Sequence, residues 1–205
     1  MSLRFMWSGF CISCGKVTNM KSQLIIEGST EDEIWQQVTK DLVGDEWIYE
    51  YPPILKQGKR EVLVDIDFDP GGGFEGGYES TLLSAVLHGR KDDFSFAIHH
   101  EGFLDEIGKF LGMQDIETGY TEFDKKVIVK SNDEEKVKQL FADSEVRSVF
   151  ELLTDFSLGI TSHHISHSNE KEYKLEFSSD LAITDPIELR KIYHAFVVLL
   201  DQLEA

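Results

Sequence analysis

The stretch that decides the fold is residues 185–205, which read DPIELRKIYHAFVVLLDQLEA. It opens with the residues that commonly start a helix: Asp185 as the cap, Pro186 at the first helical position and Glu188 at the third. Beyond them, apolar residues recur every three or four positions and therefore share one face of a helix. A helix with so broad an apolar face has to bury it against a sheet or against another helix. The residues of this stripe are Leu189, Ile192, Tyr193, Phe196, Leu199, Leu200 and Leu203.

Alternating apolar and polar residues upstream predict the sheet that this helix covers. Residues 61–69 give the clearest strand, with apolar side chains on one face and aspartates on the other. The runs at 156–160 and 173–177 also alternate, and they offer an apolar face just before the helix. Further strands are predicted at residues 23–27, 46–51, 94–99 and 123–130, and residues 78–87 are compatible with a strand or a helix.

Capping residues followed by apolar residues at helical spacing predict further helices. Thr30 and Glu33 have the spacing of a capping box, and the helix that follows them has a fitting end at Gly44. The other predicted helices are a short one at 103–111, one capped by Asn132 and one that starts at Ser144.

The order of these elements indicates the fold class. Strands cluster and helices cluster, without regular β–α alternation along the chain, which favours an α+β fold. We expect a largely antiparallel sheet packed by several helices, with a long C-terminal helix. Residues 1–21 show no sustained periodicity and are predicted to be an N-terminal tail. A linker at 113–121 would divide the rest into α+β subdomains at 22–112 and 121–205, unless the two halves form one continuous domain.

The charge balance excludes some partners. The 205 residues include 38 Asp and Glu against 20 Lys and Arg, which gives a net charge of −18. A surface this negative repels the phosphates of nucleic acids and of anionic membranes. No stretch approaches the roughly 18 apolar residues that span a bilayer. We therefore expect no nucleic-acid partner and no membrane partner. Since the two cysteines form no disulfide framework, a reducing, cytoplasmic location is predicted.

Part of the chain resembles a known family. The run EGFLDEIGKFLGMQDI at 101–116, the triplet EFD at 122–124 and the run VIVKSNDEE at 127–135 resemble a bacterial family of uncharacterised proteins. The resemblance covers residues 31–205 and is strongest at 101–135. It implies that residues 78–87 form a strand that pairs with the strand at Phe94. The family has no assigned activity, so the resemblance supports the fold class and supplies no catalytic residues.

A glycine-rich loop at residues 71–77 formally matches the dinucleotide-binding fingerprint. Gly71, Gly73 and Gly76 have the G-x-G-x-x-G spacing, and the loop follows a strand. Acidic side chains surround the loop, however, so a pyrophosphate would meet like charge. A wide turn between two strands is the preferred interpretation. The surrounding acids are Asp65, Asp67, Asp69 and Glu75.

Three of these acids also suggest a metal site. Asp65, Asp67 and Asp69 share one strand face at a spacing of about 7 Å, where carboxylate oxygens can hold Ca²⁺ or Mg²⁺. Pro70 stands where a calcium-binding loop has glycine, so that loop pattern is incomplete. A solvated acidic strand face is the preferred interpretation.

Cys11 and Cys14 have the spacing of half a zinc site. The chain has no second cysteine pair, so histidines would have to complete the site; a tail with free thiols is the preferred interpretation. His99 and His100 are neighbours in a strand and point to opposite faces, so they cannot chelate one ion together. The histidines available in a polar stretch are His163, His164 and His167.

No motif in the sequence demands one particular chemistry. The chain lacks a G-x-S-x-G elbow, an H-E-x-x-H helix and a P-loop lysine. The sequence therefore assigns no catalytic, cofactor-binding or metal-binding residue and implies no cofactor. We expect a non-catalytic protein that binds another protein or a small ligand. Two alternatives stay open: a dinucleotide-dependent or metal-assisted enzyme built on the loop at 71–77 and its acids, and a homo-oligomeric structural protein that uses the C-terminal helix.

Overall fold

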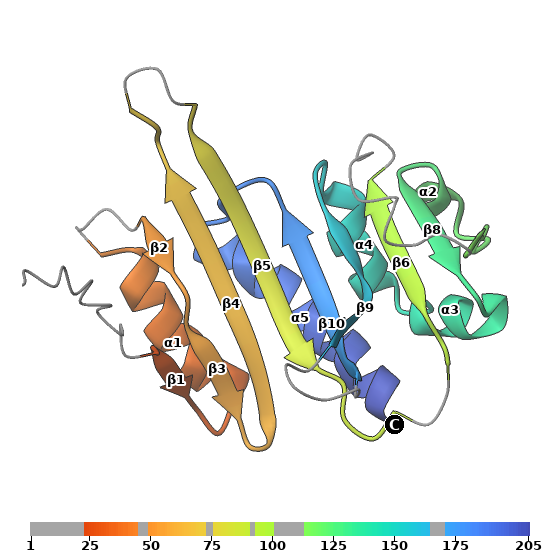
Figure 1. The fold of residues 1–205 in the computed structure, drawn as a ribbon, viewed down its shortest axis with the longest axis horizontal. Coiled ribbons are helices and arrows are strands. Elements are labelled where there is room, and N and C mark those ends of the chain that lie inside the picture. The colour runs from red at the N-terminus through yellow and green to blue at the C-terminus, as the bar shows by residue number, and fades with distance from the viewer. Residues whose placement is uncertain (1–22, 45–48, 73–75, 91–92, 101–112, 165–170) are drawn as a thin grey trace, which may run out of the picture.

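Strands from both halves of the chain meet in one large sheet (Figure 1). The computed structural model describes residues 23–44, 49–72, 76–90, 93–100, 113–164 and 171–205. The strands are β1 (Ile25–Glu27), β2 (Glu50–Tyr51), β3 (Ile54–Gln57), β4 (Arg60–Asp69), β5 (Tyr78–Val86), β6 (Phe96–His100), β7 (Gln114–Asp115), β8 (Val127–Ser131), β9 (Ser157–His164) and β10 (Lys171–Ser179).

The order of the strands is not their order in the chain. Across the sheet they lie as β1-β3-β4-β5-β10-β9-β6-β8-β7, and β2 pairs with β4 beside β3. All these pairs are antiparallel except β1 with β3, which is parallel. The hairpin of β9 and β10 follows the 113–121 segment in the chain, yet it lies between β5 and β6, which both precede that segment. The two halves of the chain are therefore interleaved in the sheet.

The helices of the described residues share one core with one face of this sheet. In Figure 1, α1, α4 and α5 lie behind the strands. The buried side chains of all the helices belong to the same cluster as the buried strand residues. The structure therefore confirms the predicted α+β class and the mostly antiparallel sheet. The helices are α1 (Glu31–Leu42), α2 (Thr121–Asp124), α3 (Glu134–Leu140), α4 (Ser144–Leu152) and α5 (Pro186–Glu204).

Helix α5 forms as its sequence predicts. The Asp185 carboxylate accepts the backbone N–H groups of Ile187 (2.7 Å) and Glu188 (3.1 Å), which satisfies donors that the first turn leaves unpaired. Six of the seven residues of the apolar stripe are buried, and Leu203 is partly buried against the same core. Tyr193 meets Trp35 of α1 edge to face, with ring centroids 5.6 Å apart. Burial raises the pKa of Tyr193 to about 12.

Helix α1 confirms the predicted capping box. Thr30 Oγ1 accepts the N–H of Glu33 (3.3 Å), and the Glu33 carboxylate accepts the N–H of Ser29 (2.7 Å). Its apolar stripe, Ile34, Trp35 and Val38, is buried.

Phenylalanine rings join the sheet to α3 and α4. Neighbouring ring centroids are 5.4–6.3 Å apart, in stacked, tilted and edge-to-face pairs. The contacts run from Phe96 of β6 through Phe141, at the end of α3, and Phe150 of α4 to Phe177 of β10, so they fix these helices against β6 and β10. The linked rings are Phe94, Phe96, Phe123, Phe141, Phe150, Phe156 and Phe177.

One predicted strand pairing is wrong. The resemblance implied that residues 78–87 pair with the strand at Phe94, but β5 lies between β4 and β10, and β6 lies between β9 and β8. The buried face of β5 explains its position, because Leu83 and Ala85 stand opposite Phe177 and Leu175 of β10 in the shared core.

Two local predictions around β8 also need correction. The predicted strand at 123–130 begins at Val127, and Phe123 belongs to the short helix α2. The Asp124 carboxylate closes this helical turn by accepting the N–H groups of Thr118 (3.0 Å) and Gly119 (2.8 Å). Asn132 does not cap α3, because Asp133 does so by accepting the N–H of Lys136 (3.0 Å).

Two predicted segments, the N-terminal tail and a short helix, are not among the residues that the structure describes. The tail at 1–21 with Cys11 and Cys14, and the helix at 103–111, lie outside the described residues. In the part of the chain that the structure does describe, no helix combines the length and the apolar character needed to cross a bilayer.

The central role of α5 predicts a large effect of truncating its core. We expect Phe196→Ala to lower the free energy of unfolding by about 3–5 kcal/mol, because Phe196 is fully buried against the sheet. Ile187→Ala on the exposed side of the same helix should change it by no more than about 0.5 kcal/mol. Urea unfolding measures both values. If Phe196→Ala instead left a folded monomer and dissolved a dimer on size-exclusion chromatography, the stripe would be an interface between subunits.

Candidate functional site

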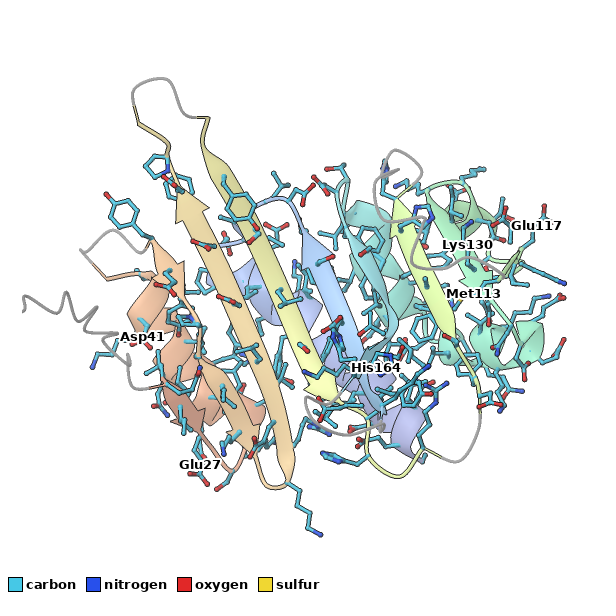
Figure 2. The ribbon with its side chains drawn as sticks, in the orientation of Figure 1. Glu27, Asp41, Met113, Glu117, Lys130 and His164 are labelled. Carbon is cyan, nitrogen blue, oxygen red and sulfur yellow. The ribbon has the colours of Figure 1, made fainter. Side chains whose placement is uncertain are left out.

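The sheet face opposite the helices, here called the open face, carries polar and acidic side chains. On β4 the buried residues Val62, Val64 and Ile66 face the helices, so the odd-numbered positions point the other way. This face is turned toward the viewer in Figure 2, since α5 lies behind the strands in that orientation. Its side chains include Leu63, Asp65, Asp67, Leu82, Ser84, Val86, His99, Ile128, Lys130, Ser157, Thr161, His163, Lys174, Glu176 and Ser178.

The strand register places five of these residues in one row across the sheet. Asp65 stands opposite Leu82, Leu82 opposite Ser178, Ser178 opposite Ser157, and Ser157 opposite His99. The Ser157 and Ser178 hydroxyls are 2.9 Å apart and share a hydrogen bond. The row therefore runs from an acid on β4 to an imidazole on β6, and we call it the Asp65–His99 row.

Next to this row lies a cluster of four polar side chains, Ser84, Thr161, His163 and Glu176. The Glu176 carboxylate accepts hydrogen bonds from Thr161 Oγ1 (2.7 Å) and Ser84 Oγ (3.2 Å). His163 Nε2 lies 3.2 Å from the same carboxylate and 3.0 Å from Thr161 Oγ1. Three strands supply these groups, and we call them the Glu176 cluster.

The Glu176 cluster does not have the geometry of a catalytic triad. A triad needs the hydroxyl on one imidazole nitrogen and the carboxylate on the other, so that the carboxylate orients the base. Here Thr161 and Glu176 both approach Nε2 of His163, and the Thr161 hydroxyl donates its proton to Glu176. The arrangement fixes the carboxylate in place and activates no nucleophile.

At the end of the Asp65–His99 row, the imidazole of His99 is buried. Its side chain is 4 % exposed, and Nδ1 lies 3.1 Å from the carbonyl oxygen of His100. Because a carbonyl only accepts, Nδ1 carries the proton in this pair and Nε2 is an acceptor in the neutral ring. Nε2 is buried, and no described residue forms a hydrogen bond with it. Leaving such a group unpaired costs about 1–3 kcal/mol, and because the atom is buried, a molecule docking on the surface does not reach it.

At the other end of the row, carboxylates crowd together. Burial raises the pKa of Asp65 above its ordinary value, and the nearby charges of Asp67 and Glu50 raise it further. Glu50 and Asp67 are directly opposite each other on β2 and β4. Like charges placed this closely repel, so positive charge brought to this end of the face would be favourable.

The glycine loop lacks the element that dinucleotide binding requires. The chain after the loop continues as strand β5, so no helix N-terminus follows to receive a pyrophosphate. Gly71 takes a positive φ of 73°, and its N–H binds the Asp69 carboxylate (2.9 Å), as in a tight turn. Glu75 and Gly73 lie outside the described residues.

The remaining candidate ligands do not converge. Among the residues that the structure describes, no group of three or more His, Cys, Asp or Glu side chains is placed to hold a metal ion. His163 belongs to the Glu176 cluster, and His164 is exposed at the end of β9 (Figure 2). Cys11, Cys14 and His167 lie outside the described residues.

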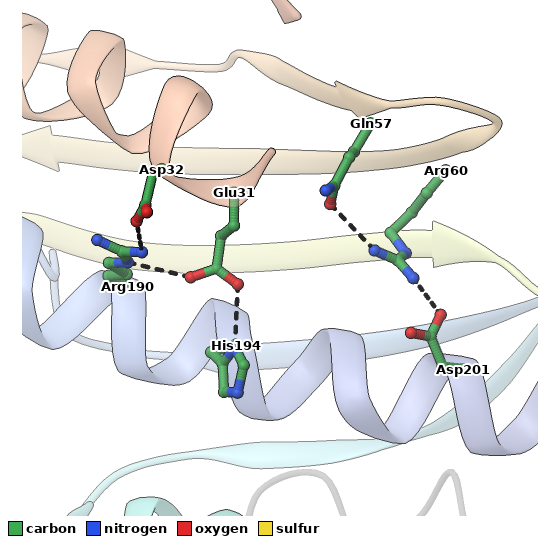
Figure 3. A network of polar contacts seen from close by, with 7 residues as sticks. All are labelled: Glu31, Asp32, Gln57, Arg60, Arg190, His194 and Asp201. Atoms are coloured by element: carbon green, nitrogen blue, oxygen red, sulfur yellow. Dashed lines mark hydrogen bonds and ion pairs between the residues drawn. The ribbon is translucent and has the colours of Figure 1, made fainter. Parts of the chain in front are cut away.

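A second polar network lies on the helix side and is structural (Figure 3). Arg190 of α5 pairs with Glu31 (3.0 Å) and Asp32 of α1, and His194 Nδ1 lies 2.9 Å from Glu31. Farther along α5, Asp201 pairs with an arginine of β4, Arg60, which also binds Gln57. Exposed ion pairs of this kind contribute about 0–1 kcal/mol each, so the network aligns α5 without forming a reaction site.

The sequence prediction missed the site that the fold assembles. Alternation predicted the strands at 156–160 and 173–177, but it contained no information on which strands are neighbours. Asp65 and Asp67 were identified as candidates and lie on the open face, whereas Ser84 and His99 acquire a role through the register alone.

Comparison with known proteins adds no relative: no family model, curated protein or solved structure matches the chain. The resemblance at residues 101–135 thus stays a prediction.

The crowding at Asp65 predicts a pH-dependent effect on stability. Because the folded state raises the pKa of Asp65, ionising this group weakens folding, and stability is lost as pH rises through that pKa. Asp65→Asn should therefore raise the melting temperature at neutral pH. This gain should shrink as pH falls through the raised pKa of Asp65 in the folded protein, and it should vanish below the ordinary pKa of an aspartate. Glu117→Gln, at an exposed position, is the control and should show no such pH-dependent gain. A melting temperature for Asp65→Asn below the wild-type value at pH 7 would contradict the electrostatic reading.

Proposed function

We propose that the protein is a non-catalytic binding protein whose open face engages a partner protein through that partner's basic surface. The observation that carries the proposal is the Asp65–His99 row. The row begins where the carboxylates of Asp65, Asp67 and Glu50 lie close together, and ammonium or guanidinium groups of a partner would offset their repulsion. Lys and Arg side chains supply such donors together with positive charge.

The shape of the open face supports a protein partner over a small molecule. Small-molecule sites are usually concave and enclosed, whereas the Asp65–His99 row crosses five strands of an extended sheet. Partly exposed apolar residues, among them Leu63, Leu82 and Val86, lie between the polar groups. Apolar area interspersed with charge is typical of protein interfaces.

The charge of the whole chain supports the same choice. A net charge of −18 creates a long-range field that attracts basic proteins and speeds their encounter, an effect that salt screens. The geometry of the Glu176 cluster, with carboxylate and hydroxyl on one imidazole nitrogen, favours binding over acyl-transfer catalysis.

Affinity capture with matched charge variants tests the proposal. We expect immobilised wild-type protein to retain a basic protein from a lysate of the source organism and to release it as salt is raised. Asp65→Asn/Asp67→Asn should lower retention by about tenfold or more, since it removes the carboxylates that the partner neutralises. Glu134→Gln/Glu135→Gln on α3 removes two exposed charges on the helix side and should leave retention unchanged. Equal retention by both variants, or retention of no basic protein, would refute the proposed function.

A further inference from the structure

An open edge lies inside the sheet, along the second half of β9. This strand pairs with β10 from Ser157 to His164 but with β6 from Ser157 to Gly159. Beyond Gly159, no strand in the described part of the chain pairs with β9 on its β6 side. Residues 160–164 therefore present backbone donors and acceptors along one edge, which is a template for adding another strand.

The separation of β6 from β9 is fixed by hydrogen bonds on the far side. At Gly159 the two strands are very close, because a Cβ there would lie 2.7 Å from the carbonyl oxygen of Phe96. Just before Phe96, the chain turns toward β8. Asn132 Oδ1 accepts the N–H of Ser95 (2.8 Å), and Asn132 Nδ2 donates to the carbonyl of Asp93 (2.7 Å). A side-chain amide thus takes the place of a strand partner and holds residues 93–95 away from β9.

Two adjacent cavities occupy the gap. One of about 480 Å³ lies between residues 160–163 of β9 and the segment with Asp93 and Ser95, and Glu176 also lines it. The other, of about 330 Å³, lies on the helix side. Both are lined by Ile160 and Arg90, so they meet at these residues. The apolar lining of the second cavity is Leu87, Phe94, Leu140, Ile160 and Leu203.

The chain itself places a cation in this gap. The Arg90 guanidinium lies 4.2 Å from the ring centroid of Tyr173 and donates to the carbonyl oxygen of Phe94. A cation over an aromatic face is favourable, and the neighbouring Glu176 carboxylate adds negative charge. A basic side chain of the protein therefore occupies the gap, which shows that cationic groups fit between Tyr173 and the carbonyl oxygen of Phe94.

We propose that the open edge of β9 takes up an extended basic segment of the partner protein as an added strand, an inference that rests on the proposed function. Backbone hydrogen bonds to residues 160–164 would supply affinity, and side chains would point alternately to the two faces of the sheet. Cationic side chains then face Glu176, and apolar ones enter the cavity at Leu140 and Leu203. The segment recognised would thus alternate basic and apolar residues.

Selection from a library of short linear peptides displayed on phage tests this inference without the natural partner. We expect enrichment of alternating basic and apolar sequences. In the best synthetic peptide, methylating the backbone nitrogens that face β9 should weaken binding by about tenfold or more, and methylating those that face away should not. No enrichment, or loss of binding independent of which nitrogen is methylated, would refute strand addition.

Protein variants separate this inference from the function on which it rests. Ser162→Trp, at an exposed position that lines the gap, should block both the peptide and the captured basic protein. Thr154→Trp, exposed between α4 and β9, is the matched control and should bind both normally. If Ser162→Trp still retains the basic protein while Asp65→Asn/Asp67→Asn loses it, the open face is the binding surface and the β9 edge is not the docking site.

Discussion

The burial of α5 against one face of the sheet is the interaction on which the rest of the structure depends. Its apolar stripe covers the centre of the sheet, and α1 and α4 pack beside it, so the described helices lie on one side. A sheet covered in this way has a second face that no described helix protects. The polar and acidic residues of that face satisfy one another in the Glu176 cluster and crowd at Asp65, which is why we place the proposed binding surface there.

The two features assigned to binding differ in what they ask of a partner. The Asp65 end of the Asp65–His99 row offers negative charge, and it tolerates many arrangements of basic groups. The β9 edge requires an extended backbone in one register, because hydrogen bonds and side-chain alternation both constrain it. Selectivity would therefore come from the edge, whereas the rate of encounter would come from the acidic face. A partner that matched only one of these two features of the protein would bind weakly or without selectivity.

Much of the local structure could be predicted because its causes are local. Asp185 caps α5 and Thr30 caps α1 through hydrogen bonds to residues at most three positions away, and periodicity alone identified their buried faces. The pairing of β5 could not be predicted, since it depends on how Leu83 packs against Phe177 far along the chain. The role of Asn132 was also hidden, because the neighbouring Asp133 supplies the cap and leaves the amide to bind Ser95. The Glu176 cluster needs two registers at once, that of β10 with β5 and that of β10 with β9, and a single sequence contains neither.

The insertion of β10 beside β5 has a consequence for how the molecule folds. Ser84 and Glu176 in the sheet are 92 positions apart, and Arg190 of α5 and Glu31 of α1 are 159 apart, so the sheet and its helices both come together through contacts distant in the chain. Contacts of this kind form only once the long intervening segments have been brought together, and this entropic cost generally slows folding. During synthesis, β5 would emerge long before β10 and wait with its apolar face uncovered. The acidity of the chain then has a second use, because mutual repulsion keeps such unfinished chains apart until the C-terminal helix is made.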